Sequence, residues 1–208
     1  MNGFKYGKNP YLLFKAWFRA ATESQGGELA STMVLATVDK NLPSVRFVLF
    51  KGFVLSGKAF SFYTNFESRK AVELAKNPRA SMAFYWAPLN RQVRIEGKIQ
   101  KLSRKDSQKY FSSRARDSQI HAWASPQSAV LSQSGDAPWA SRKFLEARVE
   151  AVAELVKEQK SLPCPAHWGG YGLVPDRIEF WQAGKNRLHY RVRFTWVRGR
   201  WISEELAP

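Results

Sequence analysis

The sequence predicts an α+β protein built on an antiparallel sheet that forms a small closed or split barrel. The first observation is a series of closely spaced segments rich in β-branched and aromatic residues, at 32–38, 44–52, 59–65, 80–87 and 91–102. The second is the return of this pattern at 177–182, 188–196 and 200–203. Helical patterns separate the two series, and the order of strands, helices and strands favours an α+β fold.

Two helical segments precede or interrupt the first strands. Asn9 followed by Pro10 is typical of an N-cap with proline at the first helical position, and predicts a helix through about Thr22. A short helix is predicted at 68–76, where the following Asn-Pro pair ends it because the residue before a proline avoids the helical conformation.

The middle of the chain is predicted to be helical. Ser103 with Asp106 resembles a capping box, which starts a helix that is broken near Ala115 and resumes through about residue 123. A further helix is predicted at 138–158, after a connector at 132–138, and a loop is predicted to follow it at 161–175. The whole chain is therefore expected to form one domain, 1–208, with a helical segment at about 103–160 inserted between barrel strands.

Residues 91–102 carry the clearest alternation in the sequence. Apolar Val93, Ile95 and Ile99 face one way, and the polar residues between them face the other way. This pattern predicts a strand with one buried face.

Composition limits the classes of protein that the chain can belong to. A hydrophobic content of 44% and an aromatic content of 14% argue against a disordered chain. The formal net charge of +16 favours an anionic partner, which could be nucleic acid, a membrane surface or a phosphorylated small molecule. Charge alone does not choose among these three.

Cysteine and histidine usage argues against disulfides and metal. Cys164 is the single cysteine, so an internal disulfide is excluded, and the three histidines are too widely spaced to predict a metal site. No segment approaches the ~18 apolar residues of a membrane span, and the N-terminal residues are repeatedly interrupted by lysine and arginine. The expected location is the cytoplasm.

Three donors at steps of four suggest a phosphate site. Tyr110, Arg114 and Ser118 would lie on neighbouring turns if the segment were helical, and hydroxyl and guanidinium groups suit a phosphate. A solvated surface is the alternative. No glycine-rich phosphate loop is present, so side chains would have to hold any anion.

Further cations lie beside strands. Arg46 and Lys51 stand at opposite ends and on opposite faces of a mostly apolar strand, which either reaches solvent at both ends or passes beneath a flat ligand. Arg69 and Lys70 fall in the first turn of a helix, where cations oppose the helix dipole unless an anion is present.

A third cluster lies near the C-terminus. Arg187, His189 and Arg191 alternate, so a continuous strand would place them on one face, close in sequence to Trp181. Three such residues seldom line an apolar core, since each would need a partner. The pattern favours a polar site.

Seven motifs, in order along the chain, resemble those of one known family. They are RFVLFK (46–51), FYTNFESRKA (62–71), RQVRIEGK (91–98), YFSSRARDSQIHAWASPQS (110–128), WGGY (168–171), IEFWQAGKNRLHYR (178–191) and the terminal LAP. The family is pyridoxamine 5'-phosphate oxidase, and the resemblance extends over nearly the whole chain after about residue 9. It implies an FMN-binding split β-barrel, antiparallel and Greek-key-like with peripheral helices, in a homodimer with FMN at the subunit interface.

The resemblance also implies site residues at matching positions. FMN would contact Arg46, Phe47, Val48, Leu49, Phe50, Lys51, Tyr63, Thr64, Arg69, Lys70, Gln92, Gln127, Ser128, Trp181 and Arg191. The substrate phosphate would be held by Lys51, Tyr110, Arg114 and Ser118. Arg187, Leu188 and His189 would contact the pyridine ring, and Arg187 and His189 are the catalytic candidates, with Arg187 acting mainly as a clamp.

The implied reaction is oxidation of pyridoxamine 5'-phosphate or pyridoxine 5'-phosphate to pyridoxal 5'-phosphate, in vitamin B6 cofactor biosynthesis. A hydride would pass from C4' to flavin N5, and dioxygen would take up the electrons to give hydrogen peroxide. No nucleic-acid or membrane partner is expected. One alternative is a related split-barrel flavin oxidase acting on another aromatic substrate, as in phenazine pathways. The other is a basic nucleic-acid-binding module.

The chain departs from the family pattern at several positions. Ala115 stands where a proline is common, which is consistent with the predicted break in the helix. Glu205 stands where an arginine usually precedes the final LAP, and the segment before the first helix is short. Tyr6 is the candidate in that segment for part of the lid that closes over the substrate in the family.

Overall fold

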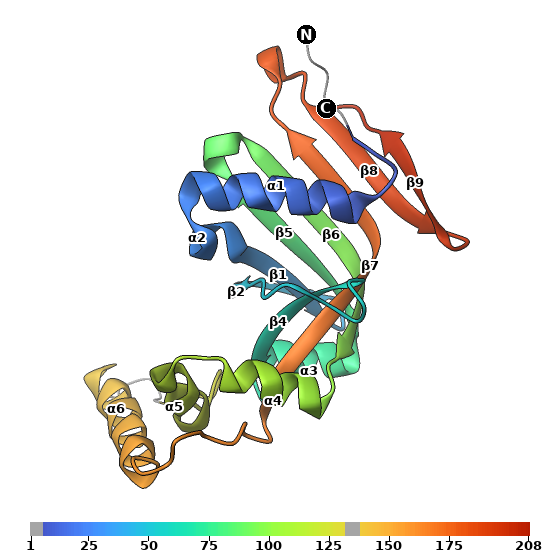
Figure 1. The fold of residues 1–208 in the computed structure, drawn as a ribbon. Coiled ribbons are helices and arrows are strands. Elements are labelled where there is room, and N and C mark those ends of the chain that lie inside the picture. The colour runs from blue at the N-terminus through green and yellow to red at the C-terminus, as the bar shows by residue number, and fades with distance from the viewer. Residues whose placement is uncertain (1–5, 132–137) are drawn as a thin grey trace. The chain divides into compact units, whose positions relative to one another are not determined.

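The computed structural model describes residues 6–131 and 138–208 (Figure 1). These residues divide into two compact units. The sheet unit contains the described residues up to Phe62 together with Lys76–Gln100 and Gly172–Pro208, and the helical unit contains Tyr63–Ala75 and Lys101–Tyr171. The expectation of one domain stays a prediction. The predicted connector at 132–138 lies, except for its last residue, outside the described residues.

In the described residues the strands form one nine-stranded sheet. The order is β2-β1-β5-β6-β7-β4-β3, and β8 and β9 continue from β7. Every pair with an assigned register is antiparallel. The bounds are β1 Thr32–Asp39, β2 Leu42–Leu49, β3 Phe53–Val54, β4 Ala59–Asn65, β5 Arg79–Trp86, β6 Arg91–Lys101, β7 Trp168–Gln182, β8 Tyr190–Val197 and β9 Arg200–Glu205. This confirms the antiparallel α+β fold, and the order of the described strands is open, so the sheet is split and not closed.

Helices precede, interrupt and follow the first strands. Their bounds are α1 Pro10–Gln25, α2 Gly27–Ser31, α3 Arg69–Lys76, α4 Arg104–Ser112, α5 Arg116–Ala124 and α6 Pro138–Leu155, with short 3₁₀ turns at Ala87–Leu89 and Lys185–Arg187. Both predicted caps are confirmed. Asn9 Oδ1 accepts from the Tyr11 amide at 2.9 Å, and Ser103 Oγ accepts from the Asp106 amide at 3.0 Å.

Phe14 of α1 lies at the centre of the core of the sheet unit. Figure 1 shows α1 lying across strands of this unit. The Phe14 side chain is fully buried, and its ring centroid lies 4.9–6.0 Å from six other aromatic rings. These rings are Phe18, Phe50, Phe53, Phe60, Phe84 and Trp86. Burial of this aromatic face holds the helix on the sheet.

Strand β6 confirms the predicted alternation. Val93 and Ile95 are fully buried and Ile99 is 5% exposed, while Arg94 and Lys98 between them are exposed. The strand therefore buries one face, as period-two patterning predicts.

Strand β7 corrects the sequence prediction, which placed a loop at 161–175. The strand begins at Trp168 and runs for 15 residues. Its glycines allow close packing and do not form a turn. Within the helical unit, a Cβ atom added at Gly170 would lie 2.6 Å from the Tyr63 ring. In the sheet unit, a Cβ at Gly97 of β6 would overlap the carbonyl oxygen of Val174. Glycine in a strand interior often marks such an approach of neighbouring atoms.

The second predicted strand, 44–52, is wrong at its C-terminal end. β2 ends at Leu49, which pairs with Thr32, the first residue of β1. Beyond this point the Phe50 amide donates to Ser31, and the Lys51 amide donates to Ser61 of β4. The backbone thus changes partner at Phe50, so Arg46 and Lys51 do not lie on one strand.

Candidate functional site

Tyr110, Arg114 and Ser118 lie on two helices and the link between them. Tyr110 is in the last turn of α4, Ser118 is in the first turn of α5, and Arg114 falls between the two helices. Ala115 is the N-cap of α5 and provides no side-chain cap. The predicted break is confirmed, so the three side chains do not follow one continuous helical face.

Arg114 is a partly buried cation with an unused donor. Its guanidinium carbon lies 4.7 Å from the centroid of the Trp168 ring and 5.9 Å from that of Phe111. Its Nη1 atom is buried and has no hydrogen-bond partner among the described residues. Burial lowers the pKa of Arg114, because desolvation disfavours the charged form. An anion that reached Nη1 would satisfy this donor.

Tyr63 and Tyr110 stack on each other beside this arginine. Their ring centroids are 3.8 Å apart and their planes differ by 20°. Burial, with smaller contributions from the neighbouring Tyr110 and Asp106, raises the pKa of Tyr63 to about 12. The Tyr63 hydroxyl therefore stays protonated at neutral pH and can donate a hydrogen bond. Of the residues predicted to hold the substrate phosphate, Tyr110 and Arg114 are thus brought together in the helical unit.

Lys70 connects several residues that the resemblance assigns to FMN. Its side chain is 7% exposed, and Nζ donates to Thr64 Oγ1 and Ser68 Oγ, each at 3.0 Å. Thr64 Oγ1 in turn donates to Gln127 Oε1 at 2.9 Å, and the Asn65 amide donates to the same oxygen at 3.3 Å. A buried ammonium needs such polar neighbours. Thr64, Lys70 and Gln127 therefore form one hydrogen-bonded network.

Arg69 and Ser128 lie close to this network in sequence. Arg69 begins α3, and its Nε donates at 2.8 Å to Glu73, whose side chain is 4% exposed. Ser128 has a φ of 71°, a left-handed conformation that is uncommon for a residue with a side chain. The Arg69 side chain itself is largely exposed, so its remaining donors stay accessible from solvent.

The segment 46–51 is divided between surface and core in the sheet unit. Arg46 donates to Leu35 O, Thr37 Oγ1 and Ser44 Oγ at 3.2, 2.5 and 2.8 Å. Phe50 is 6% exposed and belongs to the aromatic core, whereas Lys51 is exposed. Val48 and Leu49 are partly buried.

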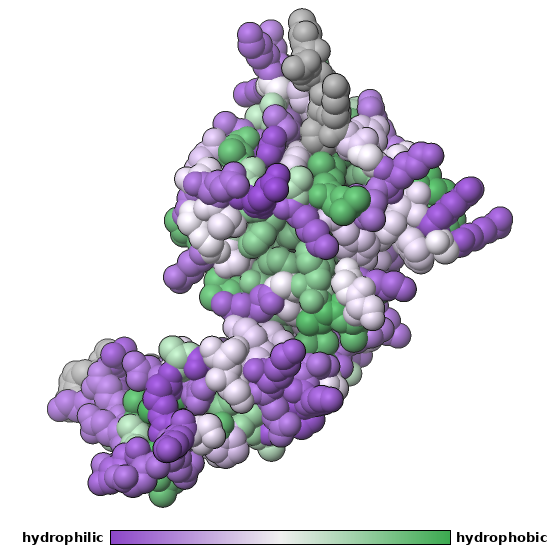
Figure 2. Space-filling view, viewed as in Figure 1, coloured by the Kyte–Doolittle hydropathy of each residue, from purple (hydrophilic) through white to green (hydrophobic). Residues whose placement is uncertain are grey.

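Strand β2 also presents large apolar side chains to solvent. Leu42, Val45 and Phe47 are 71%, 67% and 74% exposed. Figure 2 shows hydrophobic residues at the surface over the strands of the sheet unit, surrounded by hydrophilic residues. Apolar surface of this kind is typical of a face that a ligand or another protein covers.

The predicted strand face of Arg187, His189 and Arg191 is wrong. Residues Lys185–Arg187 form a 3₁₀ turn, and Arg187 has a φ of 63°, so the strand β8 begins only at Tyr190. A Cβ at Gly184 would overlap the carbonyl oxygen of Leu188, which shows how tightly the turn closes. The turn breaks the two-residue period, and only Arg191 is in the strand.

His189 and Trp181 nevertheless lie together. Their ring centroids are 4.8 Å apart, and the Gly184 amide donates to His189 Nδ1 at 3.3 Å. Leu188 is 70% exposed, and Arg187 is exposed in the turn.

Gln92 is a partly buried residue of β6 and pairs in register with Tyr85.

Glu179 is a partner of Arg191 that sequence reasoning missed. Its Oε1 accepts from Arg191 Nε at 2.9 Å and from Nη2 at 2.7 Å, and Arg94 Nη1 lies 3.6 Å from Oε2. Arg191 Nη1 also donates to the carbonyl of Ala207 at 2.8 Å. The carboxylate therefore neutralises Arg191 and fixes its direction. The sequence offers one signal for Glu179: it lies two residues before Trp181, and therefore on the same face of the strand.

Replacing Glu179 by glutamine is expected to lower the free energy of unfolding by about 2 kcal/mol, because it leaves Arg191 without its carboxylate. Urea unfolding followed by circular dichroism would measure the change. The matched control is Glu204→Gln, since Glu204 pairs with Arg193 at 2.8 Å but has a side chain that is 52% exposed, against 9% for Glu179. The control should stay within about 0.5 kcal/mol of the original protein. Equal losses in both variants would contradict a buried structural pair at Glu179.

Trp168 is the second functional candidate that sequence reasoning did not assign. It is 6% exposed and lies beside Tyr63, Tyr110 and Arg114. Its position in the WGGY motif was the available signal. A lone tryptophan next to two glycines is also consistent with the loop that the sequence predicts at 161–175.

Other features involve residues outside the predicted FMN and substrate sets. Tyr6 donates through its hydroxyl to Glu205 Oε1 at 2.9 Å, which raises the pKa of Tyr6. A pocket of about 270 Å³ between α5 and α6 includes His121 and Ala124 in its lining and none of the predicted site residues. In the described part of the chain, no cluster of three or more His, Cys, Asp or Glu side chains suits a metal ion, and no helix has the length and apolarity that a membrane crossing requires.

The fold defines a class of protein. The chain is an α+β protein whose open antiparallel sheet carries peripheral helices, as in split barrels, and its helical unit contains an arginine whose buried Nη1 atom has no hydrogen-bond partner among the described residues. A family model described as Pyridoxamine 5'-phosphate oxidase matches residues 27–156, and the chain belongs to this family. A second model, described as Pyridoxine 5'-phosphate oxidase C-terminal dimerisation region, matches residues 168–208.

Curated relatives and solved structures agree with this assignment. A pyridoxine/pyridoxamine 5'-phosphate oxidase from Pseudomonas putida is 43% identical over 201 residues, covering 96% of this chain and 88% of the relative. One from Burkholderia mallei is 48% identical over 188 residues, covering 90% and 82%. The crystal structure of PhzG from Burkholderia lata in complex with tetrahydrophenazine-1-carboxylic acid has a TM-score of 0.85 at 28% identity, covering 97% and 94%. An FMN-binding protein from Nostoc punctiforme, related to pyridoxamine 5'-phosphate oxidase, shares the fold, with a TM-score of 0.70 at 17% identity, covering 96% and 98%.

Proposed function

We propose that this protein oxidises pyridoxamine 5'-phosphate and pyridoxine 5'-phosphate to pyridoxal 5'-phosphate with FMN as its cofactor. The observation that carries the proposal is the buried Nη1 of Arg114, which has no hydrogen-bond partner among the described residues. The neighbouring Tyr110 hydroxyl adds a second donor group from α4. A guanidinium fork and a hydroxyl suit an oxyanion such as a phosphate dianion better than they suit a neutral ring.

FMN fits the donor set that the remaining predicted residues provide. In the helical unit the buried Lys70 ammonium, Arg69, Thr64 and Gln127 offer the cationic and amide groups that a flavin phosphate and its polar edge require. Bound FMN would supply the hydride acceptor for C4' of the substrate and the reaction with dioxygen that releases hydrogen peroxide.

Arg187 and His189 would act on the substrate ring. His189 is held between Trp181 and the Gly184 amide, so its ring direction is fixed before a ligand arrives. Arg187 stands in a tight turn with its side chain exposed, where it can close over a planar ring. Such a clamp accelerates a reaction by holding the reacting carbon in place, without itself exchanging a proton.

A homodimer is part of the proposal. Residues 168–208 match a dimerisation region, and β2 exposes Leu42, Val45 and Phe47 at one end of the sheet order. A second copy of the chain would cover apolar surface of this kind, which is costly to leave in water.

The second candidate is an oxidase of phenazine-type substrates. The observation that favours it is the 0.85 TM-score and 28% identity to PhzG, solved with a tetrahydrophenazine carboxylic acid. The higher identity, 43% and 48%, to relatives named pyridoxine/pyridoxamine 5'-phosphate oxidase weighs against it.

Peroxide release with four vitamers tests the proposed function. The purified protein, loaded with FMN, is given the 5'-phosphates of pyridoxamine and pyridoxine and the two unphosphorylated forms, with tetrahydrophenazine-1-carboxylic acid as a fifth substrate. We expect kcat/KM for the phosphorylated forms to exceed that for the unphosphorylated ones at least about 100-fold, from two charge-assisted hydrogen bonds. Faster oxidation of the phenazine compound would support the second candidate. A colourless protein that takes up no FMN and binds nucleic acid with a steep salt dependence would reject both.

A further inference from the structure

We propose that Trp168 is a positioning residue, whose indole ring holds the Arg114 guanidinium so that Nη1 is presented to the substrate phosphate. The inference rests on the proposed function, since it concerns the phosphate end of that same substrate. The guanidinium carbon lies 4.7 Å from the Trp168 ring centroid, within the range of a cation–π contact.

The ring positions Arg114 without neutralising it. Arg191 is held by a carboxylate, Glu179, whose charge compensates its own. The guanidinium of Arg114 instead contacts the aromatic rings of Trp168 and Phe111, and both are uncharged. An arginine held in this way keeps its full positive charge for an incoming phosphate.

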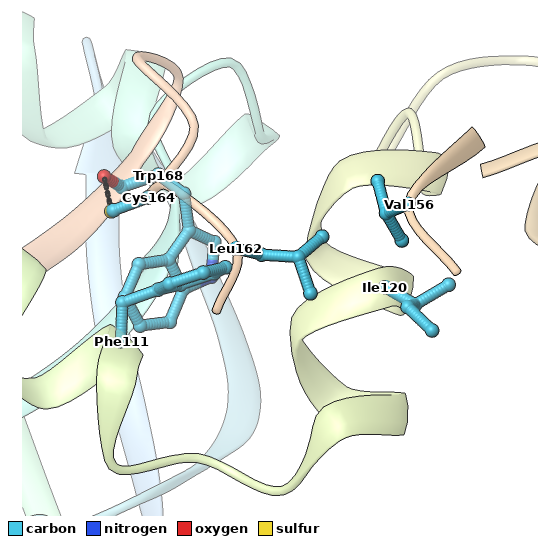
Figure 3. Packing of buried hydrophobic residues seen from close by; sticks show 6 residues of the cluster. All are labelled: Phe111, Ile120, Val156, Leu162, Cys164 and Trp168. Atoms are coloured by element: carbon cyan, nitrogen blue, oxygen red, sulfur yellow. Dashed lines mark hydrogen bonds between the residues drawn. The ribbon is translucent and has the colours of Figure 1, made fainter. Parts of the chain in front are cut away.

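Trp168 is itself firmly held. Arg104 Nη1 donates to its carbonyl at 3.3 Å, and its amide donates to Pro165 O at 3.2 Å. The edge of the Phe111 ring meets the indole at a centroid distance of 5.2 Å. Figure 3 shows these two rings against each other, with Leu162 on the side toward the neighbouring helices. A ring fixed on backbone and side chain has little freedom to follow a moving arginine.

The backbone on both sides supports the same arrangement. Gln119 Nε2 donates to the carbonyl of Arg114 at 2.9 Å, which fixes the link between α4 and α5. A Cβ at Gly169 would lie 2.6 Å from the Phe66 ring, and a Cβ at Gly170 would lie the same distance from the Tyr63 ring. The two glycines after Trp168 therefore let the strand approach the Phe66 and Tyr63 rings. This close approach fixes the position of the indole beside Arg114.

The test compares Trp168→Leu and Trp168→Phe in the FMN-loaded protein. Removing the indole should lower kcat/KM for pyridoxamine 5'-phosphate about 10-fold in the leucine variant and less in the phenylalanine variant, which keeps an aromatic face. The ratio of kcat/KM between pyridoxamine 5'-phosphate and pyridoxamine should fall by the same factor. FMN affinity and the thermal midpoint are measured alongside. The matched control is Trp123→Leu. Trp123 lies in the same unit, on α5, and its Nε1 donates to the carbonyl of Pro163. The rings that contact the Arg114 guanidinium are those of Trp168 and Phe111.

Several outcomes would overturn the inference. A purely structural tryptophan would lower the rates with both substrates equally, so an unchanged ratio in the phenylalanine variant with reduced overall activity rejects positioning. Full activity with both substrates in the leucine variant rejects it as well. If the leucine variant does not fold, the phenylalanine variant alone decides, through the same ratio.

A binding measurement separates this inference from the proposed function. Calorimetric titration with inorganic phosphate reports the anion site of Arg114 without any turnover, and Trp168→Leu should weaken that binding about 10-fold. A protein that binds phosphate in this Trp168-dependent way but oxidises no vitamer would refute the proposed function alone. Vitamer oxidation with phosphate binding that does not depend on Trp168 would refute the inference alone.

Discussion

Arg114→Ala is expected to lower kcat/KM for pyridoxamine 5'-phosphate about 100-fold, a loss of about 3 kcal/mol in transition-state binding, because the charge-assisted hydrogen bonding of its guanidinium to the phosphate disappears. FMN should remain bound, because the network of Lys70, Thr64 and Gln127 does not include Arg114. The rate with unphosphorylated pyridoxamine should change little. Steady-state peroxide release and the flavin absorbance spectrum measure the two effects.

Arg116→Ala is the matched control for this variant. Arg116 lies two residues along the chain, is also partly buried, and donates through Nη2 to the carbonyl of Val156 at 2.5 Å. Its charge is therefore used within the protein. Activity with the phosphorylated substrate should be retained in this control. Equal losses in the two variants would show that positive charge near the site matters in general, and that Arg114 does not bind the phosphate.

Phe14→Ala is expected to lower the free energy of unfolding by about 3–5 kcal/mol, the usual cost of replacing a fully buried phenylalanine. The ring of Phe14 is fully buried and lies between α1 and strands of the sheet unit. Its removal would leave a cavity lined by aromatic rings that cannot collapse onto one another. Urea unfolding at 25 °C would measure the change through the midpoint at a constant slope.

Leu12→Ala provides the comparison on the same helix. Leu12 is 63% exposed, so the substitution removes little buried surface while changing helix propensity only slightly. The free energy of unfolding should stay within about 0.5 kcal/mol of the original value. A loss at Phe14 no larger than the loss at Leu12 would contradict the central role of the aromatic core in the sheet unit.

Local signals predicted much of the fold. The range 59–65 agrees with β4 at both ends, and α1 starts at Pro10 behind its Asn9 cap as expected. The break after α4 also follows from the sequence. These features depend on alternation, caps and turn residues within a few positions, which is why the chain shows them without its tertiary structure.

Other elements depended on contacts between distant segments. β2 ends at Leu49 because β1 begins at Thr32 and has no earlier residue to pair with it. β7 starts at Trp168 although two glycines follow, since those glycines make room for rings from other elements. The turn at Lys185–Arg187 interrupts an alternation that looked like a strand. A local pattern does not reveal a pairing partner, so these boundaries could not be predicted.

The sequence by itself determined the antiparallel α+β fold, the residues that carry positive charge and the family resemblance, because residue identity and spacing are enough for these. The tertiary structure decided what each cation does. Glu179 neutralises Arg191, Lys70 is built into a polar network, and Arg114 keeps a buried donor beside Trp168. Whether a cation is neutralised or left for a ligand depends on neighbours many residues away along the chain, and only folding brings those neighbours into contact.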